Sequence, residues 1–201
     1  MNTVVDITLI GILAAVWLAA GLLADAMPTA GSARQLRRRA GLLSALVGAG
    51  VAVFAAVPLI AGLVPGVSAA PTAALLPAVP ALLVLTATVR RLGWVRRGAG
   101  AFSTAPRTPV PPALRAAAAH PLLAAPLQIT GLAALVGLPI AAGLVALPGG
   151  QATATASLAV IAIVLAVAVI GIRAGLRHSR LAPLVMAPLH RDRERTPVGA
   201  R

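Results

Sequence analysis

Few side chains in this sequence could do chemistry. The 201 residues include 4 acids and 3 histidines but no cysteine and no tyrosine. The lack of cysteine excludes thiolate nucleophiles, thiolate metal sites and disulfides. The histidines, His120, His178 and His190, have neither the spacing of a helical metal motif nor an acidic cluster beside them. We therefore expect no catalytic centre, no metal site and no cofactor.

His120 is the histidine nearest to an apolar stretch, and Pro121 follows it at a helix-starting position. This order predicts an N-cap. Haem ligation across helices would need a second histidine at the same depth, and His178 lies several residues beyond the last apolar stretch. A membrane enzyme would have to rely on His120, Asp25 and the arginines, so the sequence disfavours one.

Transporters and pumps usually keep an ionisable residue within the membrane. Asp6 lies about one turn into the first apolar stretch, where we expect a solvated acid at a helix start rather than an ion-entry site. Asp25 follows the same stretch, and we expect it to offset neighbouring arginines. Neither acid indicates transport.

Uncharged polar residues recur at one predicted depth, in the cytoplasmic half of their helices: Ser44, Thr86, Thr88, Gln128 and Thr130. They favour bonds within or between helices, and a polar pathway facing the cytoplasm is the alternative. The Gln128 amide cannot be satisfied by its own helix alone, so it should face another helix. The indole N–H of Trp17 also needs a partner, which favours a helix or subunit contact, although a lipid-facing ring remains compatible with the sequence.

The composition requires a membrane to hold these residues. The chain is 59% hydrophobic and 10% charged with a mean hydropathy of +0.96, which excludes a soluble globular domain and a disordered chain. Residues 7–24, 40–89 and 116–172 carry no charge, and one spanning helix needs about 20 residues. They predict an all-α polytopic integral membrane bundle with five transmembrane helices, at about residues 4–24, 40–64, 69–89, 121–147 and 153–172.

The basic residues set the expected orientation. All 17 are arginines, and with five spans they fall on one face of the membrane. The positive-inside rule then places the N-terminus outside and the C-terminus in the cytoplasm, in the cell inner (plasma) membrane. A cleaved signal peptide ending near Ala24 is disfavoured, because the first residues carry an acid and no base. Seven arginines are expected to contact anionic lipid headgroups: Arg37, Arg38, Arg39, Arg90, Arg91, Arg96 and Arg97.

Prolines and glycines predict where the helices turn or break. Pro65-Gly66 should turn the chain between the second and third spans. The outer half of the third span holds Pro71, Pro77 and Pro80, and the sequence leaves open whether this half is a regular helix or is broken. Rows of small residues at fourfold spacing, such as Gly41, Ala45 and Ala49, indicate close helix packing within the bundle or against a partner.

Residues 1–180 are thus expected to form the five-helix transmembrane domain and residues 181–201 a disordered basic cytoplasmic tail. The favoured function is that of a membrane component without a catalytic centre, an accessory or assembly subunit that packs against other subunits or itself. The alternative is a small oligomeric transporter or channel whose pathway is formed by Ser44, Thr86, Gln128, Thr130 and the proline breaks of the third span. Lipid binding explains the arginines without nucleic acid.

Overall fold

The structure, a computed structural model, describes residues 2–102, 109–144, 166–167, 169–176 and 178–180, and the elements over these ranges are helical. In chain order they are α1 (Thr3–Ala26), η1 (Met27–Thr29), α2 (Ala33–Leu63), α3 (Ala70–Ala74), α4 (Ala78–Leu83), η2 (Val84–Thr88), α5 (Val89–Ala101), α6 (Pro112–Ala118) and α7 (Pro121–Ala141). The all-α fold is confirmed.

Four segments in the described part of the chain are long and apolar enough to cross a membrane: Thr3–Thr29, Ala33–Leu63, Ala78–Ala101 and Pro112–Ala141. They confirm the first, second and fourth predicted spans in outline and support a multi-pass membrane protein. The fourth predicted span ends earlier than expected, because α7 ends at Ala141 rather than near residue 147. Most of the predicted fifth span, 153–172, and the whole tail, 181–201, lie outside the described residues; 166–167 and 169–176 are helical.

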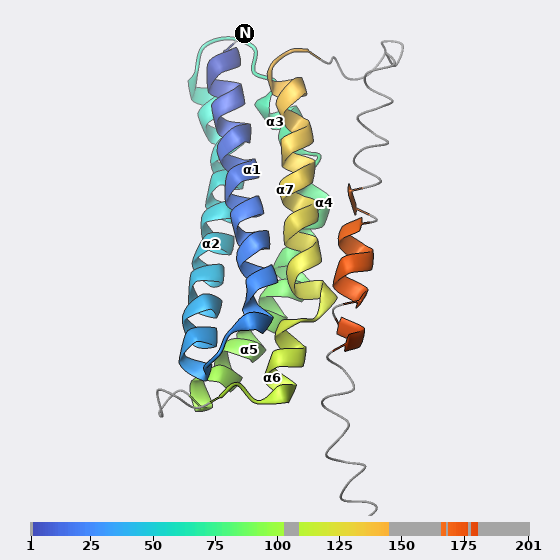
Figure 1. Cartoon of the computed structure of the whole chain (residues 1–201). Coiled ribbons are helices and arrows are strands. Elements are labelled where there is room, and N and C mark those ends of the chain that lie inside the picture. Colours follow the sequence, from blue (N-terminus) through green and yellow to red (C-terminus); the bar gives the residue numbers. More distant parts are fainter. Residues whose placement is uncertain (1, 103–108, 145–165, 168, 177, 181–201) are drawn as a thin grey trace, which may run out of the picture.

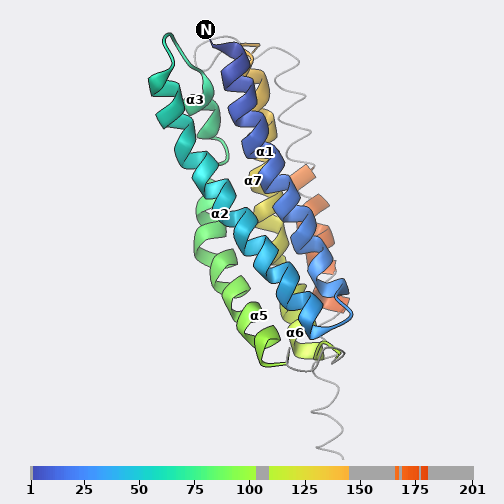
Figure 2. The same cartoon turned by 90° about the vertical axis from the view of Figure 1, so that its left-hand side faces the viewer.

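α1 is the central helix of the bundle. It lies between α2 and α7, and the chain of α3, α4, η2 and α5 runs back along α2 and α7 (Figures 1 and 2). Trp17, Ile10 and Leu13 of α1 are fully buried, as are Leu123 and Leu127 of α7. The core therefore forms mainly around the contact of the first helix with the last long helix that the structure describes.

Glycines allow this close contact of α1 with its neighbours. A Cβ atom on Gly131 of α7 would lie 2.8 Å from the backbone nitrogen of Leu18, and one on Gly21 would lie 2.7 Å from Cγ of Gln128. Neither position has room for a side chain. The fourfold rows were an uneven guide to these contacts. A Cβ atom on Gly137, whose row continues to Ala141, would lie 3.1 Å from the carbonyl oxygen of Ala73, whereas one on Gly41 or Gly48 of α2 would meet nothing within 4 Å.

The third predicted span is not one regular helix, and its predicted end is wrong. α3 stops at Ala74, three non-helical residues follow, and α4 begins at Ala78. The single π-helical turn η2 then leads into α5, which continues to Ala101 instead of ending near residue 89. Pro77 and Pro80 explain the break, because neither has the N–H that would bond the carbonyl four residues earlier, whereas Pro71 lies in the first turn of α3, where no such bond is made. The regularity of this half, which the sequence left open, is thus resolved in favour of a broken helix.

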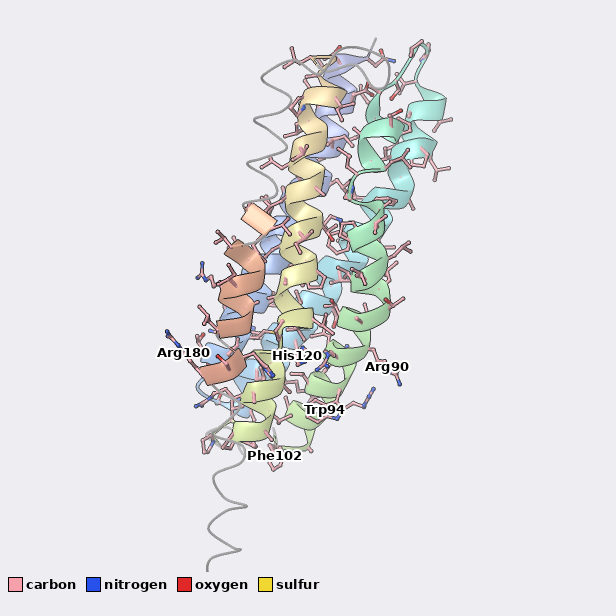
Figure 3. All side chains as sticks on the ribbon, turned by 90° about the vertical axis from the view of Figure 1, so that its right-hand side faces the viewer. Arg90, Trp94, Phe102, His120 and Arg180 are labelled. Carbon is pink, nitrogen blue, oxygen red and sulfur yellow. The ribbon has the colours of Figure 1, made fainter. Side chains whose placement is uncertain are left out.

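The arginines lie on helices more than in loops. Ser32 accepts a hydrogen bond from the backbone N–H of Gln35 and caps α2, so Arg34, Arg37, Arg38 and Arg39 all lie in the first turns of that helix. Arg90 and Arg180 lie at the end of the bundle opposite the N-terminus (Figure 3). This end also holds the short helix α6 (Figure 1).

Candidate functional site

Asp6 joins the first helix to the loop between α2 and α3. Its side chain is 1% exposed, Oδ1 accepts a hydrogen bond from Oγ of Ser68 at 2.7 Å, and Oδ2 accepts one from the backbone N–H of Ala69 at 2.9 Å. The expectation of a solvated acid was therefore wrong. A buried carboxyl group is stable here because both oxygens have donors.

Asn2 makes a second link to the same loop. Its side-chain amide donates to the carbonyl of Pro65 at 2.7 Å, next to Gly66, whose φ of +113° suits glycine and confirms the predicted turn. Asn2 and Asp6, at the start of α1, thus hold the α2–α3 loop in place through side-chain hydrogen bonds.

Thr88 makes a hydrogen bond between helices at the other half of the bundle. Its hydroxyl, which is fully buried in η2, donates to the carbonyl of Leu122 in α7 at 2.7 Å. In a regular helix the N–H of residue 126 would bond this carbonyl, but residue 126 is proline. Thr88 therefore supplies the donor that Pro126 lacks.

The four residues of the alternative pathway do not form one polar cavity. Ser44, Thr86 and Thr130 each donate to the carbonyl four residues earlier, at 2.9, 2.9 and 2.7 Å. The side chain of Gln128 packs on Gly21 of α1, so it faces another helix as predicted. Thr86 lines an open pocket of about 720 Å³ that none of the other three residues lines.

Trp17 faces α2, which settles its predicted placement in favour of a helix contact. The indole ring is fully buried, and a Cβ atom on Gly50 would lie 2.8 Å from its Cε2. Its Nε1 is buried without a hydrogen-bond partner in the described part of the structure. The ring therefore contributes packing, and the predicted partner for its N–H is not found there.

His120 caps α7 as predicted, since its Nδ1 accepts a hydrogen bond from the backbone N–H of Leu122 at 3.2 Å. The structure also brings His178 to it, with the ring centroids 4.8 Å apart and edge to face. This contact was not expected from the sequence. The carboxylate of Asp25 lies 3.9 Å from the guanidinium group of Arg173, which is much farther along the chain than the neighbouring arginines that the sequence had indicated. No group of three or more His, Asp or Glu side chains among the described residues could hold a metal ion.

Six of the seven predicted lipid-contacting arginines line open pockets at the arginine-rich end: Arg37, Arg38, Arg90, Arg91, Arg96 and Arg97. Arg39 differs from them, because its Nη1 donates to the carbonyl of Ala26 and, at 3.0 Å, to Oγ1 of Thr29. It thus supports the corner between α1 and α2. Lipid contact by any of these arginines stays a prediction.

The break between α3 and α4 has exposed apolar side chains on both sides. Leu75 and Val79 are 69% and 70% exposed. Pro80 cannot donate to the carbonyl of Leu76, four residues earlier. Pro77 likewise cannot donate to the carbonyl of Ala73, which accepts a hydrogen bond from the backbone N–H of Leu76 at 3.3 Å instead. The Ala73 carbonyl also lies against Gly137 of α7, where an added Cβ atom would be 3.1 Å away.

Sequence reasoning missed two of these contacts, Asp6 with Ser68 and Thr88 with Leu122. A signal existed for each: a lone acid within an apolar helix requires a partner, and a proline inside a helix leaves a carbonyl without a donor. No protein-family model matches the chain, and neither a curated protein nor a solved structure matches it. The site has to be interpreted from its own geometry.

Proposed function

We propose that this chain is a multi-pass protein of the plasma membrane that acts as an accessory or assembly subunit without a catalytic centre. In this proposal five helices span the bilayer, the N-terminus is outside and the C-terminus is in the cytoplasm. The positive-inside rule supports this orientation, because arginines of α2, α5 and the segment at 173–180 lie toward one end of the bundle.

The exposed break between α3 and α4 is the observation that carries the functional proposal. It lies roughly one to two helical turns from the α2–α3 loop, within reach of the hydrocarbon. Irregular backbone at membrane depth is stable only where protein or a water-filled cavity covers it. The side chains around the break are large and apolar, with Leu75 and Val79 more than two-thirds exposed. A second protein surface fits this patch better than water does.

The chemistry of the break defines the partner. Pro80 leaves the Leu76 carbonyl without a helical N–H donor, and hydroxyl or amide side chains commonly donate to such groups across membrane helices. We therefore expect a transmembrane helix of another subunit, apolar on the side facing Leu75 and Val79 and carrying a serine, threonine or asparagine at the level of Leu76.

The transporter alternative has weaker support. Its pathway would need Ser44, Thr86 and Thr130 to present free hydroxyls to a shared cavity. Each hydroxyl is used within its own helix instead. Thr130 is also fully buried. These contacts favour the structural role that the sequence had indicated for them.

Site-specific photocrosslinking in native membranes tests the proposal. A photoreactive residue at position 79 should give one discrete adduct with another membrane protein, and that protein should co-purify with the unmodified chain in a fixed ratio. The matched control is position 42, where Leu42 is 51% exposed on α2 far from the break, and where only lipid adducts are expected.

Three results would contradict the proposal. Lipid adducts alone at position 79 would show that no protein covers the break. Protein adducts of equal yield at positions 42 and 79 would show unspecific collision. An adduct of twice the mass of the chain would show self-association and favour the oligomeric alternative.

A further inference from the structure

Arginines of α2 and α5 face each other across a groove at the end of the bundle opposite the N-terminus. Two adjoining pockets of about 610 and 500 Å³ share Arg37 and Arg96. Together they are lined by Arg34, Arg37, Arg38, Arg96 and Arg97, with Gly41, Gly93 and Gly100 between them. We call this the arginine groove.

No described acid lines the arginine groove. Asp6 is bonded to Ser68 at the other end of the bundle, and Asp25 lies beside Arg173. Arg34, Arg38, Arg96 and Arg97 are all exposed. Guanidinium groups that line one groove repel one another, and they bind phosphate through paired, charge-assisted hydrogen bonds.

A track of small residues continues from the arginine groove along α2. Arg34, Arg38 and Gly41 lie on one face of the helix, and the same spacing continues to Ala45, Gly48 and Ala52. Ala45, Gly48 and Ala52 are exposed, and a Cβ atom on Gly48 would meet nothing within 4 Å. The track leads from the charged end toward the middle of the bundle and has space for an acyl chain.

We propose that the arginine groove binds an anionic phospholipid whose head group carries two phosphates. Arg34 and Arg38 of α2 hold one phosphate, and Arg96 and Arg97 of α5 hold the other. An acyl chain of the lipid lies along the small-residue track of α2. Two phosphates match the two sets of arginines, and basic pockets between membrane helices are known to take such head groups. This inference is independent of the proposed partner at the α3–α4 break.

Lipid binding to the purified full-length chain tests the proposal. Native mass spectrometry from a neutral detergent would compare cardiolipin, which has two phosphates, with phosphatidylglycerol, which has one, and phosphatidylcholine, which has no net charge. Cardiolipin should bind about tenfold more tightly than phosphatidylglycerol. Inorganic phosphate at millimolar concentration should not displace it, whereas displacement would show that the groove binds a free anion.

Arg38→Gln/Arg96→Gln should weaken cardiolipin binding about tenfold or more. The matched control is Arg173→Gln/Arg180→Gln, which removes the same charge outside the arginine groove and should change binding less than about twofold. Equal losses in the two variants, or equal binding of cardiolipin and phosphatidylglycerol to the wild-type chain, would overturn the proposal. If the first double variant does not fold, Arg38→Gln and Arg96→Gln are compared singly with Arg180→Gln under the same criteria.

A third variant tests the track without touching any charge. Gly48→Leu has room for its side chain, so the unfolding midpoint should be preserved. The leucine side chain should occupy space that the acyl chain uses on the track, reduce the apolar area buried between them and lower cardiolipin affinity about threefold. Unchanged affinity would show that the acyl chains do not use the track, and the proposal in this form would fail.

Discussion

Pro126 and Pro80 leave helix carbonyls without their usual donor, and the bundle treats the two positions differently. The Leu122 carbonyl freed by Pro126 receives the hydroxyl of the buried Thr88 at 2.7 Å. The Leu76 carbonyl freed by Pro80 lies instead in a break whose flanking residues, Leu75 and Val79, are 69% and 70% exposed. One region is completed within the chain, whereas the other is the region that we propose a second protein covers.

The outer region is held by side chains of α1 rather than by helical regularity. Asp6 accepts from Ser68 and Ala69, and Asn2 donates to Pro65. The inner region is held by α7, which packs on α1 at Gly131 and bonds Thr88. The half of the bundle near the N-terminus is thus held by hydrogen bonds from side chains of α1, and the other half by close packing of α1 on α7 and by the Thr88 hydrogen bond.

The largest expected effect is at Asp6. Asp6→Ala leaves the Ser68 hydroxyl and the Ala69 N–H without an acceptor in a buried site, and should lower the free energy of unfolding by about 3 kcal/mol. Thermal unfolding in detergent would measure the loss. Asp6→Asn keeps an acceptor oxygen and should lose clearly less, and an equal loss in both variants would contradict the bonding assigned to the carboxyl group.

Alanine substitutions at two glycines of α7 compare how much crowding each region tolerates. Gly131→Ala places a methyl group 2.8 Å from the backbone nitrogen of Leu18, so it should destabilise the chain by about 2 kcal/mol. Gly137→Ala meets the Ala73 carbonyl at 3.1 Å, on the short α3 that can shift, and should cost about 1 kcal/mol. The reverse order of unfolding midpoints would show that the outer half is the rigid one.

Thr88→Val removes the hydroxyl and keeps the shape of the side chain. It should cost about 1 kcal/mol, because the Leu122 carbonyl then has no donor from η2. The same substitution in a Pro126→Ala background should cost almost nothing, since residue 126 then has an N–H for that carbonyl. Unfolding of the four chains of this double-mutant cycle gives the coupling, and a coupling near zero would show that Thr88 does not compensate for Pro126.

The smallest effect is expected at Thr86, two residues before Thr88 in the same π-helical turn. Its hydroxyl bonds the Leu82 carbonyl of its own segment and the side chain is exposed. Thr86→Val should change the free energy of unfolding by less than about 0.5 kcal/mol. A loss as large as that of Thr88→Val would mean that hydroxyls of this turn contribute without regard to their partners.

Local physics explains what could be predicted from the sequence. Uncharged length gave the first, second and fourth spans in outline, and the prolines marked the half of the third span whose regularity the sequence left open. His120 as the cap of α7 followed from the proline after it. Each of these depends on residues adjacent in the chain, whose effect on the backbone is direct.

Contacts between distant segments could not be predicted in the same way. Ser68 is 62 residues from Asp6, and Leu122 is 34 residues from Thr88, so no local spacing joins them. The abundance of small residues also concealed the glycines that matter. Gly41 and Gly48 fall in regular rows and face open space, whereas Gly21 and Gly131 fit no recognised row and lie at close contacts between α1 and α7.

The link from Asp6 to the α2–α3 loop has a consequence for biosynthesis. The ribosome makes the acid first and its two donors 62 and 63 residues later, after all of α2. During that interval the carboxyl group of the first helix lacks its final partners. The final position of this helix in the membrane therefore depends on the later insertion of α2 and the α2–α3 loop. A nascent chain released before Ser68 should therefore expose its first helix to membrane quality-control proteases, and one released after α3 should escape them.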